Sequence, residues 1–161
     1  MMDILEFAIQ MERDGQDFYH ELASKSTHTG IKNILNMLAD DESKHQKAIE
    51  KAQTSSWDMP ETTVLDNAKN VFRQMQDFGG QFDLSGDEES LYRQAMKLED
   101  KSIAFYRDKA DQVSTPEQKA LFLKLVEEEN KHFFLLENLV NFVGAPKTWL
   151  EDAEFTRLDD Y

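Results

Sequence analysis

Two short segments, DESKHQ at residues 41–46 and EENKHF at residues 128–133, decide the fold of this chain. Each contains the pattern Glu-x-Lys-His, and the second copy follows the first at an offset of 87 residues (129 − 42 = 87). A helix places residues three positions apart on one face, one turn from each other. Glu42 and His45 can therefore reach one point, and so can Glu129 and His132.

The same offset aligns residues 5–52 with residues 92–139 without a gap, which indicates an internal repeat. Eleven of the 48 aligned pairs are identical, and one of them joins Glu12 with Glu99. Each of these two glutamates lies 30 residues before the glutamate of its own motif (42 − 12 and 129 − 99). The repeat therefore adds a third side chain of a metal-binding type to each half.

Apolar residues at a helical period predict four helices, at about residues 2–25, 30–53, 86–112 and 116–143. Thr115 is the expected N-cap of the last helix, with Pro116 at its first position, and Gly144 and Pro146 are expected to end it. The residues expected to face inward are Leu5, Ala8, Met11, Gly15, Phe18 and Leu22; Ile31, Ile34, Leu38 and Ile49; Leu91, Ala95, Leu98 and Phe105; and Leu121, Leu125, Leu136, Leu139 and Val143.

Short turns join these helices into two αα-hairpins, and a long segment of about residues 54–86 connects the hairpins. That segment is long enough to cross the whole bundle, and its stretch VLDNAKNVFRQMQDF is expected to be partly helical. The sequence predicts an all-α fold, an antiparallel four-helix bundle in residues 1–144. A short amphipathic helical tail, residues 145–161, is expected to cover the bundle or a partner subunit.

The composition narrows the functional classes. The chain has no cysteine, which excludes disulfides, thiolate zinc sites and iron–sulfur clusters and fits a reducing compartment. A net charge of −14 argues against nucleic acid and anionic membranes as partners. We see no signal peptide and no run of roughly 20 apolar residues, so we expect a cytoplasmic protein outside the membrane.

Four carboxylates and two imidazoles fall on the inner faces of the predicted helices. Left bare, four buried like charges would be costly, and Lys44 and Lys131 lie off the inner face. Two divalent or trivalent cations would neutralise all four carboxylates, and one imidazole per ion suits iron or manganese better than structural zinc or copper. The predicted ligands are Glu12, Glu42, His45, Glu99, Glu129 and His132. His20 and His28 have no such partners and are expected at the surface.

Two pairs of residues near the predicted site have two interpretations each. Tyr19 and Tyr106 follow Glu12 and Glu99 by seven residues, so each phenol either bonds to a ligand carboxylate or packs as a core aromatic. Gly15 and Ser102 either leave room for a small oxidant or serve packing alone.

The segments MERDGQDFY and LEDKSIAFY, each followed by its Glu-x-Lys-His motif, resemble the rubrerythrin branch of the ferritin-like di-iron carboxylate superfamily. The resemblance covers about residues 3–143. It implies a ferritin-like bundle whose six ligands hold two iron ions, Fe2+ or Fe3+, with Glu42 and Glu129 between the ions and an oxo or hydroxo bridge. It also implies a homodimer that reduces hydrogen peroxide or dioxygen in the peroxidase defence against oxidative stress.

Two departures from that family matter. The chain lacks the cysteine-ligated rubredoxin domain, so electrons are expected from an external donor such as a rubredoxin-like protein. Ser102 stands where the family has an extra glutamate, so the resemblance does not extend to its redox-linked ligand exchange. Three other functions stay open: a ferritin-like ferroxidase or iron store, a di-manganese catalase-like protein, and a structural bundle with a vestigial site. The intact ligand set argues against the last.

Overall fold

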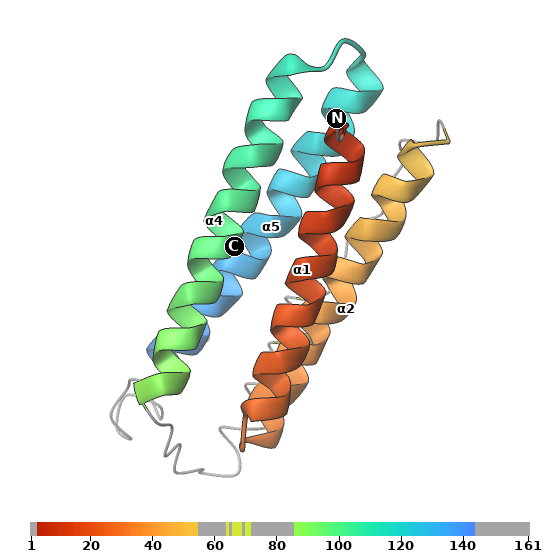
Figure 1. Cartoon of the computed structure of the whole chain (residues 1–161). Coiled ribbons are helices and arrows are strands. Elements are labelled where there is room, and N and C mark those ends of the chain that lie inside the picture. The colour runs from red at the N-terminus through yellow and green to blue at the C-terminus, as the bar shows by residue number, and fades with distance from the viewer. Residues whose placement is uncertain (1–2, 55–63, 65, 69, 72–85, 144–161) are drawn as a thin grey trace.

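The computed structural model describes residues 3–54, 64, 66–68, 70–71 and 86–143 of the 161-residue chain. Four helices dominate this part of the chain: α1 (Ile4–Lys25), α2 (Thr29–Ala52), α4 (Gly86–Gln112) and α5 (Pro116–Val143) (Figure 1). No strand occurs among the described residues. The predicted all-α bundle is confirmed, and the predicted helix ends lie within two residues of the observed ones.

Side-chain caps start three of the helices. The Asp3 side chain accepts a hydrogen bond from the Glu6 N–H of α1 at 2.8 Å. The Gln118 N–H donates to Thr115 Oγ1 at 3.2 Å, so the cap predicted for α5 is confirmed, with Pro116 as the first helical residue. His28 Nδ1 accepts from the Gly30 N–H at 3.2 Å at the start of α2. His28 is therefore a half-buried cap, whereas His20 is exposed as expected.

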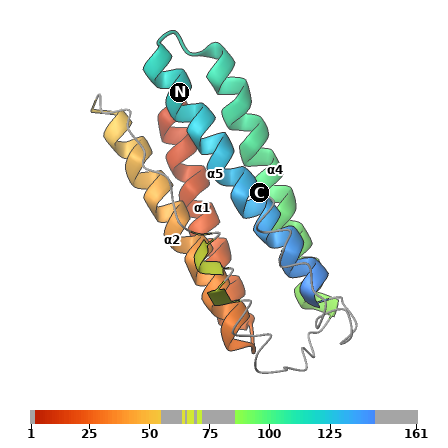
Figure 2. The same ribbon diagram turned by 180° about the vertical axis from the view of Figure 1, so that it is seen from behind.

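The two hairpins, α1 with α2 and α4 with α5, lie side by side (Figures 1 and 2). Helices α1 and α5 run in one direction along the bundle, and α2 and α4 run in the other. Since α2 ends and α4 begins at opposite ends of the bundle, the connection between them spans its length, as predicted. Within that connection, Val64, Ala68 and Val71 are helical and buried against the core. The rest of the connection and the predicted tail at 145–161 lie outside the described residues.

The core forms two apolar clusters, one toward each end of the bundle. One cluster contains Leu22, Leu38, Ala95 and Leu135, among others. The other contains Ala8, Ile49, Ile103, Leu121 and Leu125, among others. Along each helix, residues of one cluster come before the predicted ligands and residues of the other cluster come after them. The topology therefore gathers all six predicted ligands into a single polar layer between two apolar layers.

The buried stripe of two helices is rotated relative to the prediction. On α4 the buried residues follow the series Tyr92, Ala95, Glu99, Ile103, Tyr106 and Ala110. Leu98 precedes Glu99 by one residue, about 100° around the helix, and is 41% exposed, so its predicted burial is wrong. Met11, Phe18 and Phe105 are only half-buried for the same reason. These apolar side chains lie at the edge of the core.

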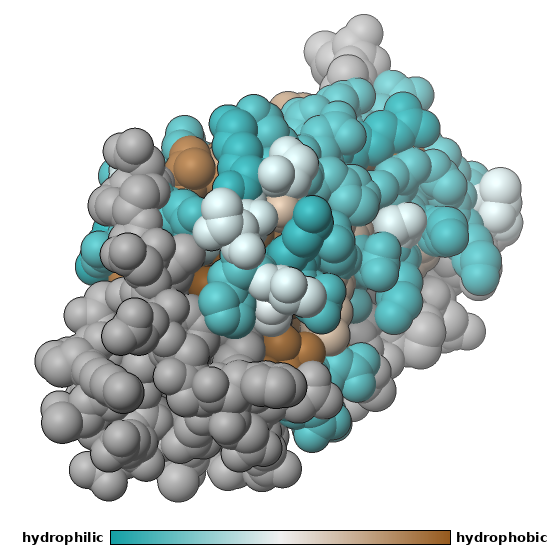
Figure 3. All heavy atoms as spheres, turned by 90° about the horizontal axis from the view of Figure 1, so that it is seen from below, coloured by the Kyte–Doolittle hydropathy of each residue, from teal (hydrophilic) through white to brown (hydrophobic). Residues whose placement is uncertain are grey.

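The described surface seen along the bundle in Figure 3 is predominantly hydrophilic. Among the helices that the structure describes, none has the length and apolar character that crossing a membrane would require.

Candidate metal centre

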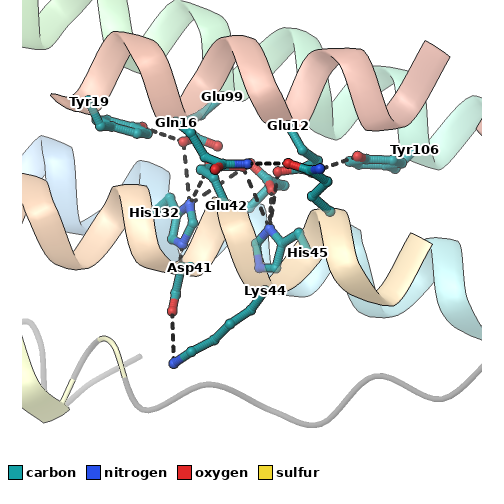
Figure 4. Close-up of polar contacts among 12 residues, drawn as sticks. Glu12, Gln16, Tyr19, Asp41, Glu42, Lys44, His45, Glu99, Tyr106 and His132 are labelled. Carbon is teal, nitrogen blue, oxygen red and sulfur yellow. Dashed lines mark hydrogen bonds and ion pairs between the residues drawn. The ribbon is translucent and has the colours of Figure 1, made fainter. Parts of the chain in front are cut away.

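All six predicted ligands lie together between the two apolar clusters, and each is at most 4% exposed. Figure 4 labels five of them, all except Glu129. The six residues form two overlapping groups. Within each group, the atoms that could bind a metal ion all lie within 4.8 Å of one another. One group is Glu12, Glu42, His45 and Glu129, and the other is Glu42, Glu99, Glu129 and His132. Glu42 and Glu129 belong to both groups. That is the position which carboxylates bridging two ions would occupy, although their role as ligands stays a prediction.

Each imidazole faces a carboxylate of the opposite hairpin. His45 Nδ1 lies 2.8 Å from Glu129 Oε1, and His132 Nδ1 lies 3.1 Å from Glu42 Oε1. The two rings are stacked, with centroids 5.3 Å apart. The reciprocal contacts relate the two halves of the site by an approximate twofold axis, which agrees with the internal repeat in the sequence.

Both tyrosines bond to a predicted ligand, but across the bundle and not along their own helix. The Tyr106 hydroxyl donates to Glu12 Oε1 at 2.6 Å, and the Tyr19 hydroxyl donates to Glu99 Oε1. Seven residues of helix span about 10 Å, which separates each phenol from the glutamate before it. Because α1 and α4 are antiparallel, Tyr19 lies level with Glu99 and Tyr106 lies level with Glu12.

Burial and mutual repulsion raise the pKa of the two shared carboxyl groups. Burial contributes most to the raised pKa of Glu42, followed by the negative charge of Glu12. Burial also contributes most at Glu129, followed by the charge of Glu42. For His45, burial lowers the pKa, but the nearby Glu12 and the other carboxylates raise it well above its usual range. His132 follows the same pattern, with Glu99 as its main partner.

The two unshared carboxyl groups shift in the opposite direction. Burial would raise the pKa of Glu12, but hydrogen bonding to Glu42 and the positive charge of His45 bring it below its usual value. The same balance, with Glu129 and His132 as partners, lowers the pKa of Glu99 to about 2. In the metal-free centre, Glu42, Glu129 and both imidazoles therefore hold protons more tightly than usual, and Glu12 and Glu99 hold them less tightly.

The residues fit a pair of metal ions. Glu12 Oε2 and Glu99 Oε2 are buried oxygens that have no hydrogen-bond donor among the described residues. They occupy equivalent places in the two halves, one in each four-residue group. Gly15 packs against the site, and a Cβ added there would lie 3.3 Å from Glu42 Cδ. Two divalent ions would satisfy these oxygens and neutralise the four carboxylates.

Asp41 is a residue of the site that the sequence interpretation missed. It is buried, and its Oδ2 lies 3.0 Å from His132 Nε2, on the far side of the ring from the carboxylates. Lys44 Nζ lies 3.8 Å from its other oxygen (Figure 4). A carboxylate on the outer nitrogen of a ligating histidine fixes the orientation and tautomer of the ring. The sequence feature that could have indicated this residue is the acidic side chain directly before the glutamate in each Glu-x-Lys-His motif.

The repeat equivalent of Asp41 is Glu128, and its contacts differ. Glu128 is also buried, and its carboxylate pairs with Lys131 Nζ at 3.1 Å. Lys131, which was expected to lie off the inner face, is largely covered, since only 12% of its side chain is exposed. His45 Nε2 has no hydrogen-bond partner in the described part of the chain. The two halves of the site are therefore unequal at their outer edge.

Comparison with known proteins agrees with this geometry. The family model described as Rubrerythrin matches residues 3–140, and the chain belongs to that family, whose members typically bind two iron ions. Among solved structures, a hypothetical protein from Pyrococcus furiosus is similar in fold, with a TM-score of 0.60 and 21% identity. That similarity covers 88% of this chain and 89% of the other. A comparison with curated proteins finds no match.

Metal binding should release protons. His45, His132, Glu42 and Glu129 have raised pKa values, so a bound metal is expected to displace the protons that these groups hold. Because the metal competes with protons, its affinity should rise with pH. Titration calorimetry with Fe2+ without oxygen, in buffers of different ionisation enthalpy, measures the release. A release near zero would contradict the protonation scheme.

Asp41→Asn should weaken one metal ion and not the other. The change removes the charge that faces His132 Nε2, and loss of such a contact typically costs about 10- to 100-fold in affinity. Anaerobic titration with Fe2+ should show one site weakened by that factor and one unchanged. Glu128→Gln is the matched control and should leave both affinities near wild type. Equal weakening of both sites by Asp41→Asn, or the same loss in the control, would show that Asp41 acts on the fold alone.

Proposed function

We propose that this protein is a di-iron oxidoreductase that reduces hydrogen peroxide. The observation that carries the proposal is the pair of four-residue groups sharing Glu42 and Glu129 in a buried layer, together with the match to the rubrerythrin family. The proposed ligands are Glu12, Glu42, His45, Glu99, Glu129 and His132. When bound, two iron ions would supply redox equivalents and polarise the O–O bond of the oxidant.

The chain's own residues would hold the ligands and supply a hydroxyl group beside the oxidant. Tyr19 and Tyr106 keep Glu99 and Glu12 in place through their hydrogen bonds. Burial and the nearby carboxylates raise the pKa of both phenols well above 10, so both stay protonated. Tyr19 also lines a cavity that opens toward solvent, whereas Tyr106 does not. Tyr19 is therefore the better placed phenol to meet an incoming peroxide, and its oxygen can accept a hydrogen bond from the peroxide O–H while its own hydrogen stays in the bond to Glu99.

The electrons would come from outside the chain. Reduction of one hydrogen peroxide to two waters consumes two electrons and two protons, and the chain has no cysteine with which to hold a second redox centre of the rubredoxin type. A small electron-transfer protein such as a rubredoxin is the donor we propose. The homodimer is proposed from the family resemblance.

The ligand assignment can be tested by counting metal. Glu42→Ala and Glu129→Ala should each lose both ions, because each side chain would contact both. His45→Ala should weaken mainly one ion, and His20→Ala, at an exposed histidine, should change nothing. Iron per chain is measured after anaerobic loading and desalting, with circular dichroism to verify folding. Two ions retained by all three site variants would show that the assignment is wrong.

The reduced, iron-loaded protein should react at least about tenfold faster with hydrogen peroxide than with dioxygen, a difference of about 1.4 kcal/mol in barrier. Stopped-flow mixing with each oxidant, followed by optical absorption, measures the two rates. A ferroxidase or iron store would instead consume dioxygen rapidly and retain many irons per assembly, and that result would replace our proposal. Manganese-loaded protein in the same assay tests the catalase-like alternative.

Ser102→Glu provides a further check on the same reaction. It places a carboxylate about one turn from Glu99, where the family has its extra glutamate. The variant should react faster with peroxide if a ligand exchange at that position limits the wild-type rate.

A further inference from the structure

A cavity of about 510 Å³ lies between α1 and α4 and reaches the candidate metal centre. Its deepest lining residues are the buried Tyr19, Glu42 and Glu99. Its outer lining includes Phe7 and Leu98, which are 46% and 41% exposed. The cavity therefore connects solvent to the carboxylates of the site.

The walls of the cavity are mainly apolar, although Asp14 and Lys101 also line it, and the apolar residues repeat between the two helices. Met11 and Phe18 of α1 correspond to Leu98 and Phe105 of α4 at the 87-residue offset, and all four line the cavity. A small residue lies between the large ones on each helix, Gly15 or Ser102. These large side chains are the ones that the sequence assigned to the core and that the structure leaves at its edge. They pack around a space, whereas ordinary interiors contain few voids larger than a water molecule.

The size of the cavity exceeds what a two-atom oxidant requires. Hydrogen peroxide takes up the volume of about one or two water molecules, each of ~30 Å³. Pockets that bind organic ligands measure about 300–1,000 Å³ and are lined mainly by apolar and aromatic side chains. At about 510 Å³, with phenylalanines in its wall, this cavity belongs to the second class.

We propose that the cavity binds organic hydroperoxides, compounds ROOH in which R is a compact aryl or branched alkyl group. This inference rests on the proposed peroxide reduction and names a further substrate class for the same site. The hydrocarbon group lies against Phe7, Phe18 and Phe105, and the hydroperoxide group points to Tyr19 and the carboxylates. An amphipathic molecule of this kind matches a cavity whose wall is apolar and whose deepest part is polar.

The reaction balances without a further reagent. The O–O bond breaks, and ROOH with two electrons and two protons gives ROH and water. The electrons come from the same external one-electron donor, and the protons come from solvent. The product alcohol leaves through the mouth of the cavity.

Binding can be tested without metal or turnover. The probe is 2-phenyl-2-propanol, the alcohol formed from cumene hydroperoxide, titrated into metal-free protein and followed by ligand-observed NMR. Wild type should bind it, and Ser102→Leu, which fills the cavity, should weaken binding at least about tenfold. Leu98→Gln should also weaken it. Leu123→Gln is the matched control, because Leu123 is 45% exposed on α5 and does not line the cavity.

Turnover provides the second readout. The ratio of kcat/KM for cumene hydroperoxide to kcat/KM for hydrogen peroxide should fall at least about tenfold in Ser102→Leu and stay constant in Leu123→Gln. The inference is overturned if wild type does not bind the alcohol, or if Ser102→Leu leaves the ratio unchanged. It is also overturned if Leu98→Gln dissociates a dimer whose second copy covers the cavity, as measured by sedimentation.

Two failures remain distinguishable in the same assay. Reduction of hydrogen peroxide without reduction of cumene hydroperoxide would overturn the substrate class alone. Reduction of neither compound would overturn the proposed function and the substrate class with it.

Discussion

Electrical neutrality in a buried layer is the constraint on which the rest of this structure depends. Four carboxyl groups and two imidazoles lie where each is at most 4% exposed. Charges in such a place are tolerated only when they are paired, protonated or bound to metal. The raised pKa values of Glu42, Glu129 and both imidazoles favour protonation, which lowers the repulsion between the carboxyl groups without metal. Two divalent cations would also meet the condition, because they balance the charge of four carboxylates.

The bundle supplies the conditions that this layer requires. Apolar clusters toward both ends of the bundle leave the cavity between α1 and α4 as the described approach of water to the carboxylates, and low exposure strengthens the electrostatic contacts between them. Each helix contributes to both clusters and to the polar layer between them. The ligands therefore lie in the middle of long helices, far from the ends where helices fray, and the crossing phenols hold two of the carboxylates in place.

The local features of the fold were predictable from sequence, because they depend on neighbours along the chain. The helices, the Thr115 cap and the pairing of each motif glutamate with its histidine follow from spacing along one helix, and the grouping of the six residues follows from their positions on the inner faces of four helices. The residues whose burial was predicted wrongly are those whose exposure depends on how far a helix is rotated about its own axis. The apolar face of α4 is wider than its buried stripe, so periodicity alone placed Leu98 inside. The contacts of Asp41 with His132, and of each tyrosine with the opposite glutamate, join different hairpins, and their partners could not be assigned before the hairpins were placed.

The two hydrogen bonds from Tyr19 to Glu99 and from Tyr106 to Glu12 also fix the position of one hairpin along the other. We call this pair of contacts the register lock. The apolar layers are built from leucine, alanine and similar side chains, which would tolerate a slide of one hairpin along the other by one helical turn. Such a slide, about 5.4 Å, would separate Tyr19 from Glu99 and Tyr106 from Glu12 at once. Each separation would leave a buried hydroxyl and a buried carboxylate unpaired, at a cost of about 1–3 kcal/mol or more per group. A residue inserted into α1 before Glu12 would leave the lock intact, whereas one inserted between Glu12 and Tyr19 would break half of it.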